Sequence, residues 1–154
     1  MKLAEALLLR KDMQTKLANL RERLAKAALV QEGDKPAEDA ERLIAESAGI
    51  IKDLYELIER LHRTNQSEKL ADGRAIAAVM AERDRLRQHL ALIRFAAERA
   101  SSDPNQDRYS AREIKWVAQL DVAKLHKQSD DISAKLRELN AALQEANWNI
   151  ELRA

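Results

Sequence analysis

Apolar residues recur at steps of three and four along four long stretches of this chain of 154 residues. This spacing places them on one side of an α-helix, and its heptad-like form from Met13 onward is typical of helices that pack side by side. The first stretch predicts a helix over 2–31. Its stripe consists of Leu3, Leu7, Arg10, Met13, Leu17, Leu20, Leu24 and Ala28.

Two further helices follow with the same spacing, one over 37–64 and one over 74–100. Gly33 stands where a left-handed C-terminal cap of the first helix is expected, and Pro36 suits the first turn of the next. The second stripe comprises Ile44, Ser47, Ile51, Leu54, Ile58 and Leu61, and Leu43, Ile50 and Leu57 widen it. The third comprises Ile76, Val79, Arg83, Leu86, Leu90, Ile93 and Ala97.

The segment after residue 110 fits two structures. Ser110 and Glu113 form a capping-box pattern, which favours one helix over 110–147. The apolar residues of 114–122 instead alternate with polar ones, which favours a short strand near 113–120 with a partner strand near 64–72. We favour the strand, followed by a helix over 121–147 with Asp121 as its N-cap. The apolar stripe of this helix is Leu125, Ser129, Ile132, Leu136, Leu139 and Leu143.

The scarcity of turn-forming residues supports a mainly α fold. Three Gly and two Pro are too few for the frequent turns of a β-sandwich or β-barrel. The sequence therefore predicts a single domain over 1–154, an elongated bundle of about four long antiparallel helices. A helix of 27 residues reaches roughly 40 Å, at ~1.5 Å per residue. Such slender rods leave apolar surface uncovered, so we expect a homo-oligomer that forms through the long helices.

Two arginines interrupt the apolar stripes. Arg10 lies in the first stripe and Arg83 in the third, and a charge in such a seam is costly unless it is paired. The best-attested role of a polar residue in a helical seam is to set register or assembly state. We therefore predict that Arg10 and Arg83 act in assembly or register, and that at least one of them meets a carboxylate.

The residues that carry chemistry are sparse. The chain contains no Cys, its three His are isolated, and its three Gly form no phosphate-binding loop, so no catalytic residue, metal site or cofactor is predicted. Glu59 and His62 match one half of a di-iron motif, but the second half is missing. Asn65, Asp72 and Arg108 fall in polar connections, where they are weak candidates for an unidentified small-molecule ligand.

The charge balance and the apolar runs limit the partners. With 27 basic and 26 acidic side chains the net charge is +1, which gives no reason to expect a nucleic-acid partner. The apolar runs are far shorter than the ~20 residues of a transmembrane helix, and Glu5 interrupts a signal-like start. A cytoplasmic protein without a transmembrane segment is therefore expected.

Several stretches together resemble a family of small bacterial proteins often labelled septicolysin. They are Met1-Lys2-Leu3-Ala4-Glu5-Ala6-Leu7, Val30-Gln31-Glu32-Gly33, Arg63-Thr64-Asn65, Leu70-Ala71-Asp72-Gly73, Arg108-Tyr109-Ser110, Glu113-Ile114-Lys115, Asp121-Val122, Leu136-Arg137-Glu138-Leu139 and Ala146-Asn147-Trp148. The resemblance implies a helix-rich, oligomeric protein of unknown role, and its label implies a cytolysin. Three functions follow: a non-enzymatic protein that self-associates, which we favour; a pore-forming or cytolytic protein; and a ligand binder or enzyme that uses the polar loop residues.

Overall fold

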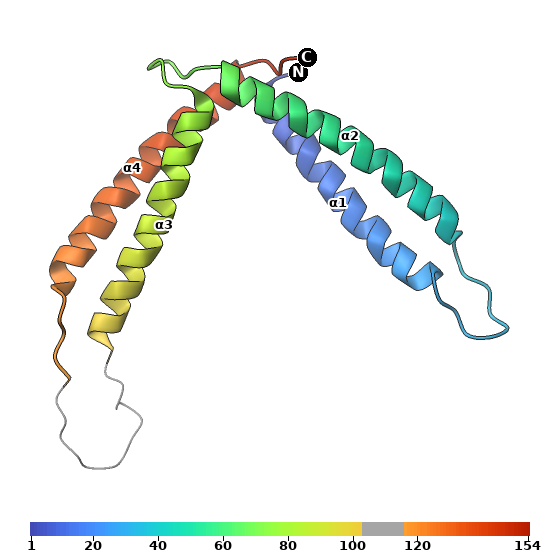
Figure 1. Cartoon of the computed structure of the whole chain (residues 1–154), viewed down its shortest axis with the longest axis horizontal. Helices are drawn as coiled ribbons and strands as arrows, with labels where there is room; N and C mark the ends of the chain where they lie inside the picture. The colour runs from blue at the N-terminus through green and yellow to red at the C-terminus, as the bar shows by residue number, and fades with distance from the viewer. Residues whose placement is uncertain (103–115) are drawn as a thin grey trace, which may run out of the picture. The chain divides into compact units, whose positions relative to one another are not determined.

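The computed structural model describes residues 1–102 and 116–154, which contain four α-helices (Figure 1). They are α1 (Leu3–Ala27), α2 (Ala40–Ser67), α3 (Ile76–Ser101) and α4 (Val122–Asn149). The mainly α fold predicted from the sequence is therefore confirmed. The chain divides into two compact units, one of Met1–Ile76 with Gln144–Ala154 and one of Ala77–Leu143. The single domain over 1–154 stays a prediction.

Unit 1 is built on the contact between α1 and α2, which lie side by side (Figure 1). Lys16 pairs with Glu46 at 3.2 Å, and further along α1 Arg23 pairs with Glu38, just before α2 begins. Around these ion pairs the two helices bury Leu20, Ala27 and Leu43. Burial of these apolar side chains stabilises the pair by roughly 2 kcal/mol for each large side chain.

The C-terminal tail closes one end of this helix pair. The backbone N–H of Leu3 donates to the Ile150 carbonyl and that of Leu152 to the Met1 carbonyl, each at 2.9 Å. The Arg153 backbone N–H donates to the Thr64 hydroxyl at 3.0 Å, and that hydroxyl donates to the Arg60 carbonyl at 2.8 Å. Thr64 is completely buried, so these bonds satisfy a hydroxyl that would otherwise be costly to bury.

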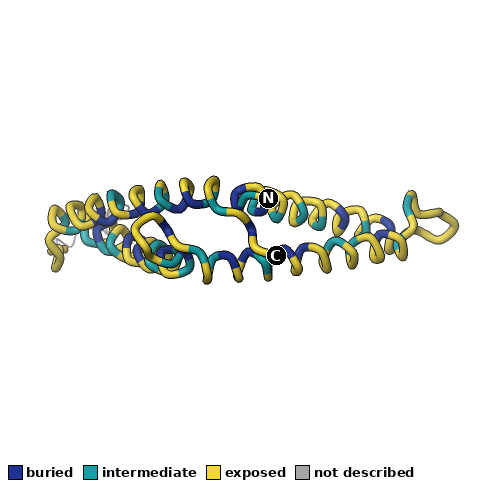
Figure 2. Tube along the Cα trace, turned by 90° about the horizontal axis from the view of Figure 1, so that it is seen from above, coloured by how far each residue is buried: buried dark blue, intermediate teal, exposed yellow. Residues whose placement is uncertain are grey.

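Unit 2 is built on the stripes of α3 and α4 that the sequence predicts. Buried positions recur along the helices at intervals of three and four (Figure 2). In this unit they are Val79, Leu86, Leu90 and Ala97 on α3, and Ser129, Ile132, Leu136, Leu139 and Leu143 on α4. A direct polar link joins the helices, since Arg94 Nε donates to Ser129 Oγ at 3.4 Å.

The predicted helix boundaries need correction around the first connection. The first helix ends at Ala27, not at 31, and Gly33 is not its C-cap but the left-handed residue (φ +92°) of a separate turn. The second helix begins at Ala40, where Asp39 accepts hydrogen bonds from the N–H groups of the first turn, and not near Pro36. Because α2 begins only at Ala40, the residues just after Ala28 have no part of α2 beside them to pack against. Leu29 is accordingly 86% exposed.

The predicted strand pair is wrong where the structure describes it. Residues 64–67 belong to α2, whose end is continued by a backbone bond from Glu68 N to the Thr64 carbonyl at 2.9 Å. After it, a single bridge joins Lys69 and Ala75 around a tight turn at Gly73. Residues 116–120 form no strand, because no second strand in the described ranges pairs with their backbone; residues 113–115 lie outside those ranges. The predicted start of the last helix is confirmed, since Asp121 accepts from Lys124 N at 3.0 Å.

Candidate functional site

An uncovered apolar surface of unit 1 follows α2. This helix carries two apolar stripes that are offset by one residue and have the same 4–3 spacing. The covered stripe is Leu43, Ser47, Ile50, Leu54, Leu57, Leu61 and Thr64. The second, which we call the outer stripe, is Ile44, Ala48, Ile51, Tyr55, Ile58 and His62.

The two stripes differ sharply in burial. On the covered stripe, the leucines at 43, 54, 57 and 61 are at most 5% exposed. On the outer stripe, Ile44 is 55%, Ile51 46% and Tyr55 65% exposed. A single neighbouring helix covers only a limited arc of another helix, and the apolar face of α2 is wider than that arc. Packing within unit 1 therefore leaves half of the apolar face of α2 open.

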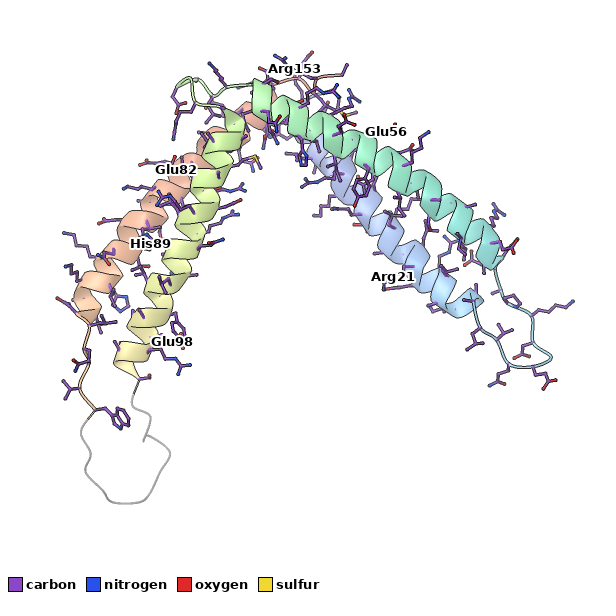
Figure 3. All side chains as sticks on the ribbon, viewed as in Figure 1. Arg21, Glu56, Glu82, His89, Glu98 and Arg153 are labelled. Carbon is purple, nitrogen blue, oxygen red and sulfur yellow. The ribbon has the colours of Figure 1, made fainter. Side chains whose placement is uncertain are left out.

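A shallow hollow lies along the outer stripe and has charged edges. Its lining combines Tyr55, Ile58 and His62 with Lys52, Glu56 and Glu59. Glu56, labelled on α2 in Figure 3, is 4.0 Å from Lys52, and Glu59 is 2.9 Å from Arg63. These ion pairs are strongly exposed, so each contributes little to stability. The charged side chains thus stay available to a partner that approaches the hollow.

Unit 2 has an apolar groove of its own, beside the C-terminal part of α3. Exposed large apolar side chains line it from α3 and from the segment that precedes α4: Leu92, Phe95, Trp116, Val117 and Leu120. The Arg99 guanidinium lies 5.3 Å from the centre of the Phe95 ring, a cation–π distance. Residues 116–120 of the segment that suggested a strand therefore form a groove wall instead.

The structure describes two of the three ligand candidates that the sequence indicated. Asn65 is half-buried on α2, whereas Asp72 is exposed in the turn before α3. Asp72 accepts from the backbone N–H of Arg74 at 3.0 Å and from its Nε at 2.9 Å. The hydrogen bond from the Arg74 side chain holds the pKa of Asp72 below its ordinary value. Arg108 lies outside the described residues. Asp72 thus has a structural role within its own turn.

The two arginines in the helical seams differ in their partners. Arg83 is mostly buried, and its Nε donates to the neighbouring Asp84 at 3.0 Å, so it does meet a carboxylate. Arg10 is half-buried, and its Nε is buried without a hydrogen-bond partner in the part of the chain that the structure describes. Leaving such a group unpaired costs about 1–3 kcal/mol. Their role in assembly or register stays a prediction.

One ion pair between α1 and the segment just before α2 was not apparent from the sequence. Arg23 Nε donates to Glu38 Oε2 at 2.9 Å, and a second guanidinium nitrogen also contacts this carboxylate. This hydrogen bonding raises the pKa of Arg23 and lowers that of Glu38. The pair joins α1 to Glu38, the residue before the Asp39 N-cap. Because the two residues are 15 positions apart, local sequence patterns do not reveal the pair.

The described residues offer neither a metal-binding cluster nor a helix that could span a membrane. Within residues 1–102 and 116–154, no cluster of three or more His, Asp or Glu side chains is close enough to hold a metal ion. Over the same ranges, none of the helices has a stretch that is both apolar enough and long enough to cross a bilayer.

Comparison with known proteins places the chain in a family. The profile of a family of unknown function (DUF6847) matches residues 10–152, and the chain belongs to this family. A crystal structure described as that of a functionally unknown conserved protein from Corynebacterium diphtheriae is 35% identical in sequence, with a TM-score of 0.90. The match covers 99% of each chain, so both share one fold over their whole length. No curated protein matches this chain.

Proposed function

We propose that this member of the DUF6847 family is a non-enzymatic cytoplasmic protein whose copies associate through their long helices. The outer stripe of α2 carries the proposal. Three large apolar side chains on it, Ile44, Ile51 and Tyr55, are each at least 46% exposed along one helix face. Soluble monomers rarely leave contiguous apolar surface of this kind in water, because its burial is worth about 25 cal/mol per Å².

The spacing of the stripe favours a helix as its partner. Residues at alternating steps of four and three form a seam whose side chains interdigitate with those of a facing helix. A second copy of this chain offers such a helix with the same apolar face. A symmetric pair built in this way covers both exposed faces at once.

Sedimentation velocity over a range of protein concentrations tests this proposal. We expect the mean mass to rise from the monomer toward an oligomer as concentration increases, at neutral pH and moderate salt. A single monomeric species up to the highest attainable concentration contradicts it.

A matched pair of variants links the association to apolar burial. Tyr55→Glu places a carboxylate in the outer stripe and should shift the equilibrium toward the monomer, because burying an unpaired charge is costly. Ala18→Glu adds the same charge at an exposed position of α1, away from the outer stripe and its edges. It should leave the mass distribution unchanged, and equal effects of both variants contradict the proposal.

The other two functions remain separate proposals with their own tests. The label of the septicolysin family that the chain resembles implies lytic activity, which dye release from lipid vesicles by the purified protein would reveal. A ligand site at the polar connections is less supported, because Asp72 already binds Arg74 with both oxygens. Saturable ligand binding that Asn65→Ala removes would favour it.

A further inference from the structure

We infer that a second copy of this chain docks its α2 on the outer stripe in the opposite direction, with Lys52 of each copy facing Glu59 of the other. This inference rests on the proposed self-association and specifies its contact surface. Lys52 and Glu59 stand one heptad apart on the same edge of the outer stripe, and both line its hollow.

The opposite edge of the outer stripe decides the relative direction. That edge is formed by Ser47, Leu54 and Leu61, which belong to the stripe covered within unit 1. In a parallel pair of helices, the edge that holds Lys52 would face this apolar edge of the other copy. In an antiparallel pair, equivalent edges face each other, so charged residues meet charged residues. The antiparallel arrangement therefore avoids placing Lys52 and Glu59 against apolar surface.

Charge along this edge then selects the alignment. With Lys52 opposite Glu59 of the second copy, two-fold symmetry creates the same contact twice. A shift by one heptad would set Lys52 opposite Lys52 of the second copy, and like charges at that position are unfavourable. The preferred alignment also sets Tyr55 beside Ile58 of the second copy and Ile51 beside its His62. The edge is thus complementary to itself only in this register.

Charge reversal with mixing tests the inference. Lys52→Glu places two acidic pairs in the contact and Glu59→Lys two basic pairs, so each variant alone should dimerise roughly tenfold more weakly than the unmodified chain. In an equimolar mixture of the two variants, every facing pair again has opposite charges. Sedimentation should then show a mixed dimer whose affinity returns to near that of the unmodified chain.

The design separates the interface from effects inside one helix. Each variant also loses an exposed ion pair within α2, Lys52–Glu56 or Glu59–Arg63, and that loss persists in the mixture. Recovery on mixing therefore comes only from contacts between copies. Lys52→Glu combined with Glu59→Lys in one chain should recover as well. Lys11→Glu and Glu22→Lys, at exposed positions of α1, are the charge-matched controls and should change nothing.

Failure would identify which statement is wrong. If the unmodified chain dimerises and the mixture is no tighter than either variant alone, the contact proposed here is overturned while self-association stands. If the unmodified chain stays monomeric at every concentration, both statements are overturned.

Discussion

The two units bury their helix pairs to different depths, although both use stripes of the same spacing. Six large side chains in the described residues are almost fully buried: Leu3, Leu20, Leu61, Thr64, Ile76 and Val79. The first five belong to unit 1, and only Val79 belongs to unit 2. The leucines at 136, 139 and 143 of the α4 stripe in unit 2 keep 5–8% exposure.

A third chain segment explains the difference at the end of unit 1 that holds Leu3 and Thr64. In unit 1 the tail after α4 crosses the end of the α1–α2 pair, where Leu152 N bonds to the Met1 carbonyl and Arg153 Nε to Glu68 at 2.7 Å. Two helices alone leave the sides of their seam open to water, whereas a third segment covers one of those sides. We therefore expect unit 1 to be the more protected of the two, most of all around Thr64.

Truncation of a core leucine should show the largest effect and a contrast between units. Leu61→Ala removes a side chain that is 2% exposed and should cost about 3–5 kcal/mol of unfolding free energy, whereas Leu136→Ala at 8% should cost about 2–3 kcal/mol. Urea unfolding measures both, and amide hydrogen exchange assigns the loss to a unit. Equal costs would show that the tail adds no protection.

Removal of one buried hydroxyl should have the next largest effect. Thr64→Val keeps the shape of the side chain but leaves the Arg153 N–H without its acceptor, which should cost about 1–3 kcal/mol. In unit 2, Ser129→Ala removes a hydroxyl bonded by Arg94 at 3.4 Å, a long contact, so its cost should stay under about 1 kcal/mol. Thermal unfolding measures both costs. A larger cost for Ser129→Ala would contradict the conclusion that unit 1 is the more tightly packed of the two.

Substitution of Gly49 should stabilise unit 1. This glycine lies inside α2, and a Cβ built on it meets nothing within 4 Å. Gly49→Ala should therefore raise the unfolding free energy by about 0.5–1 kcal/mol, since glycine is unfavourable inside a helix. Gly73→Ala is the opposite control, because φ there is +86° and a side chain is strained in that conformation. An unchanged unfolding free energy for Gly49→Ala would indicate that another molecule contacts this face of α2.

Acid should weaken unit 1 by a small amount through one ion pair. The pKa of Glu38 is lowered by Arg23, so this pair stabilises the folded state above the ordinary pKa of about 4.5, and the contribution disappears as pH falls through the lower folded value. The protection factors of amides near residues 23 and 38, taken against the intrinsic exchange rate at each pH, should therefore fall at acidic pH. Glu38→Gln should remove that part of the pH dependence; a profile identical to the unmodified chain would show that the pair contributes nothing.

Local patterns predicted much of the fold. The stripes from Leu3 to Leu24 and from Val79 to Ala97 do face their helix partners, and Asp121 does cap α4. Each depends on residues close in sequence, where the helical repeat determines which side chains share a face. The prediction of a strand near 113–120 was wrong over its described part, residues 116–120, because an alternating sequence forms a strand only beside a second strand.

Contacts between distant residues escaped prediction. The hydrogen bond from Arg153 N to Thr64 joins positions 89 residues apart, and the sequence around one residue does not indicate the other as its partner. For the same reason, the sequence showed that the apolar face of α2 is wide but not which half α1 covers. The structure distinguishes the outer stripe, because Leu54 and Leu57 are buried whereas Ile51 and Tyr55 are exposed.

Cross-linking between two cysteine variants tests the central claim most directly. The chain contains no Cys, so Lys52→Cys and Glu59→Cys each introduce a single reactive thiol. The protein is treated with a short bismaleimide at a concentration above the dissociation constant of the dimer. An equimolar mixture of the two variants should yield far more linked dimer than either variant alone, because the two positions face each other only across copies. Equal yields in the three samples, or no linked dimer in the mixture, would contradict the antiparallel association in which Lys52 of one copy faces Glu59 of the other.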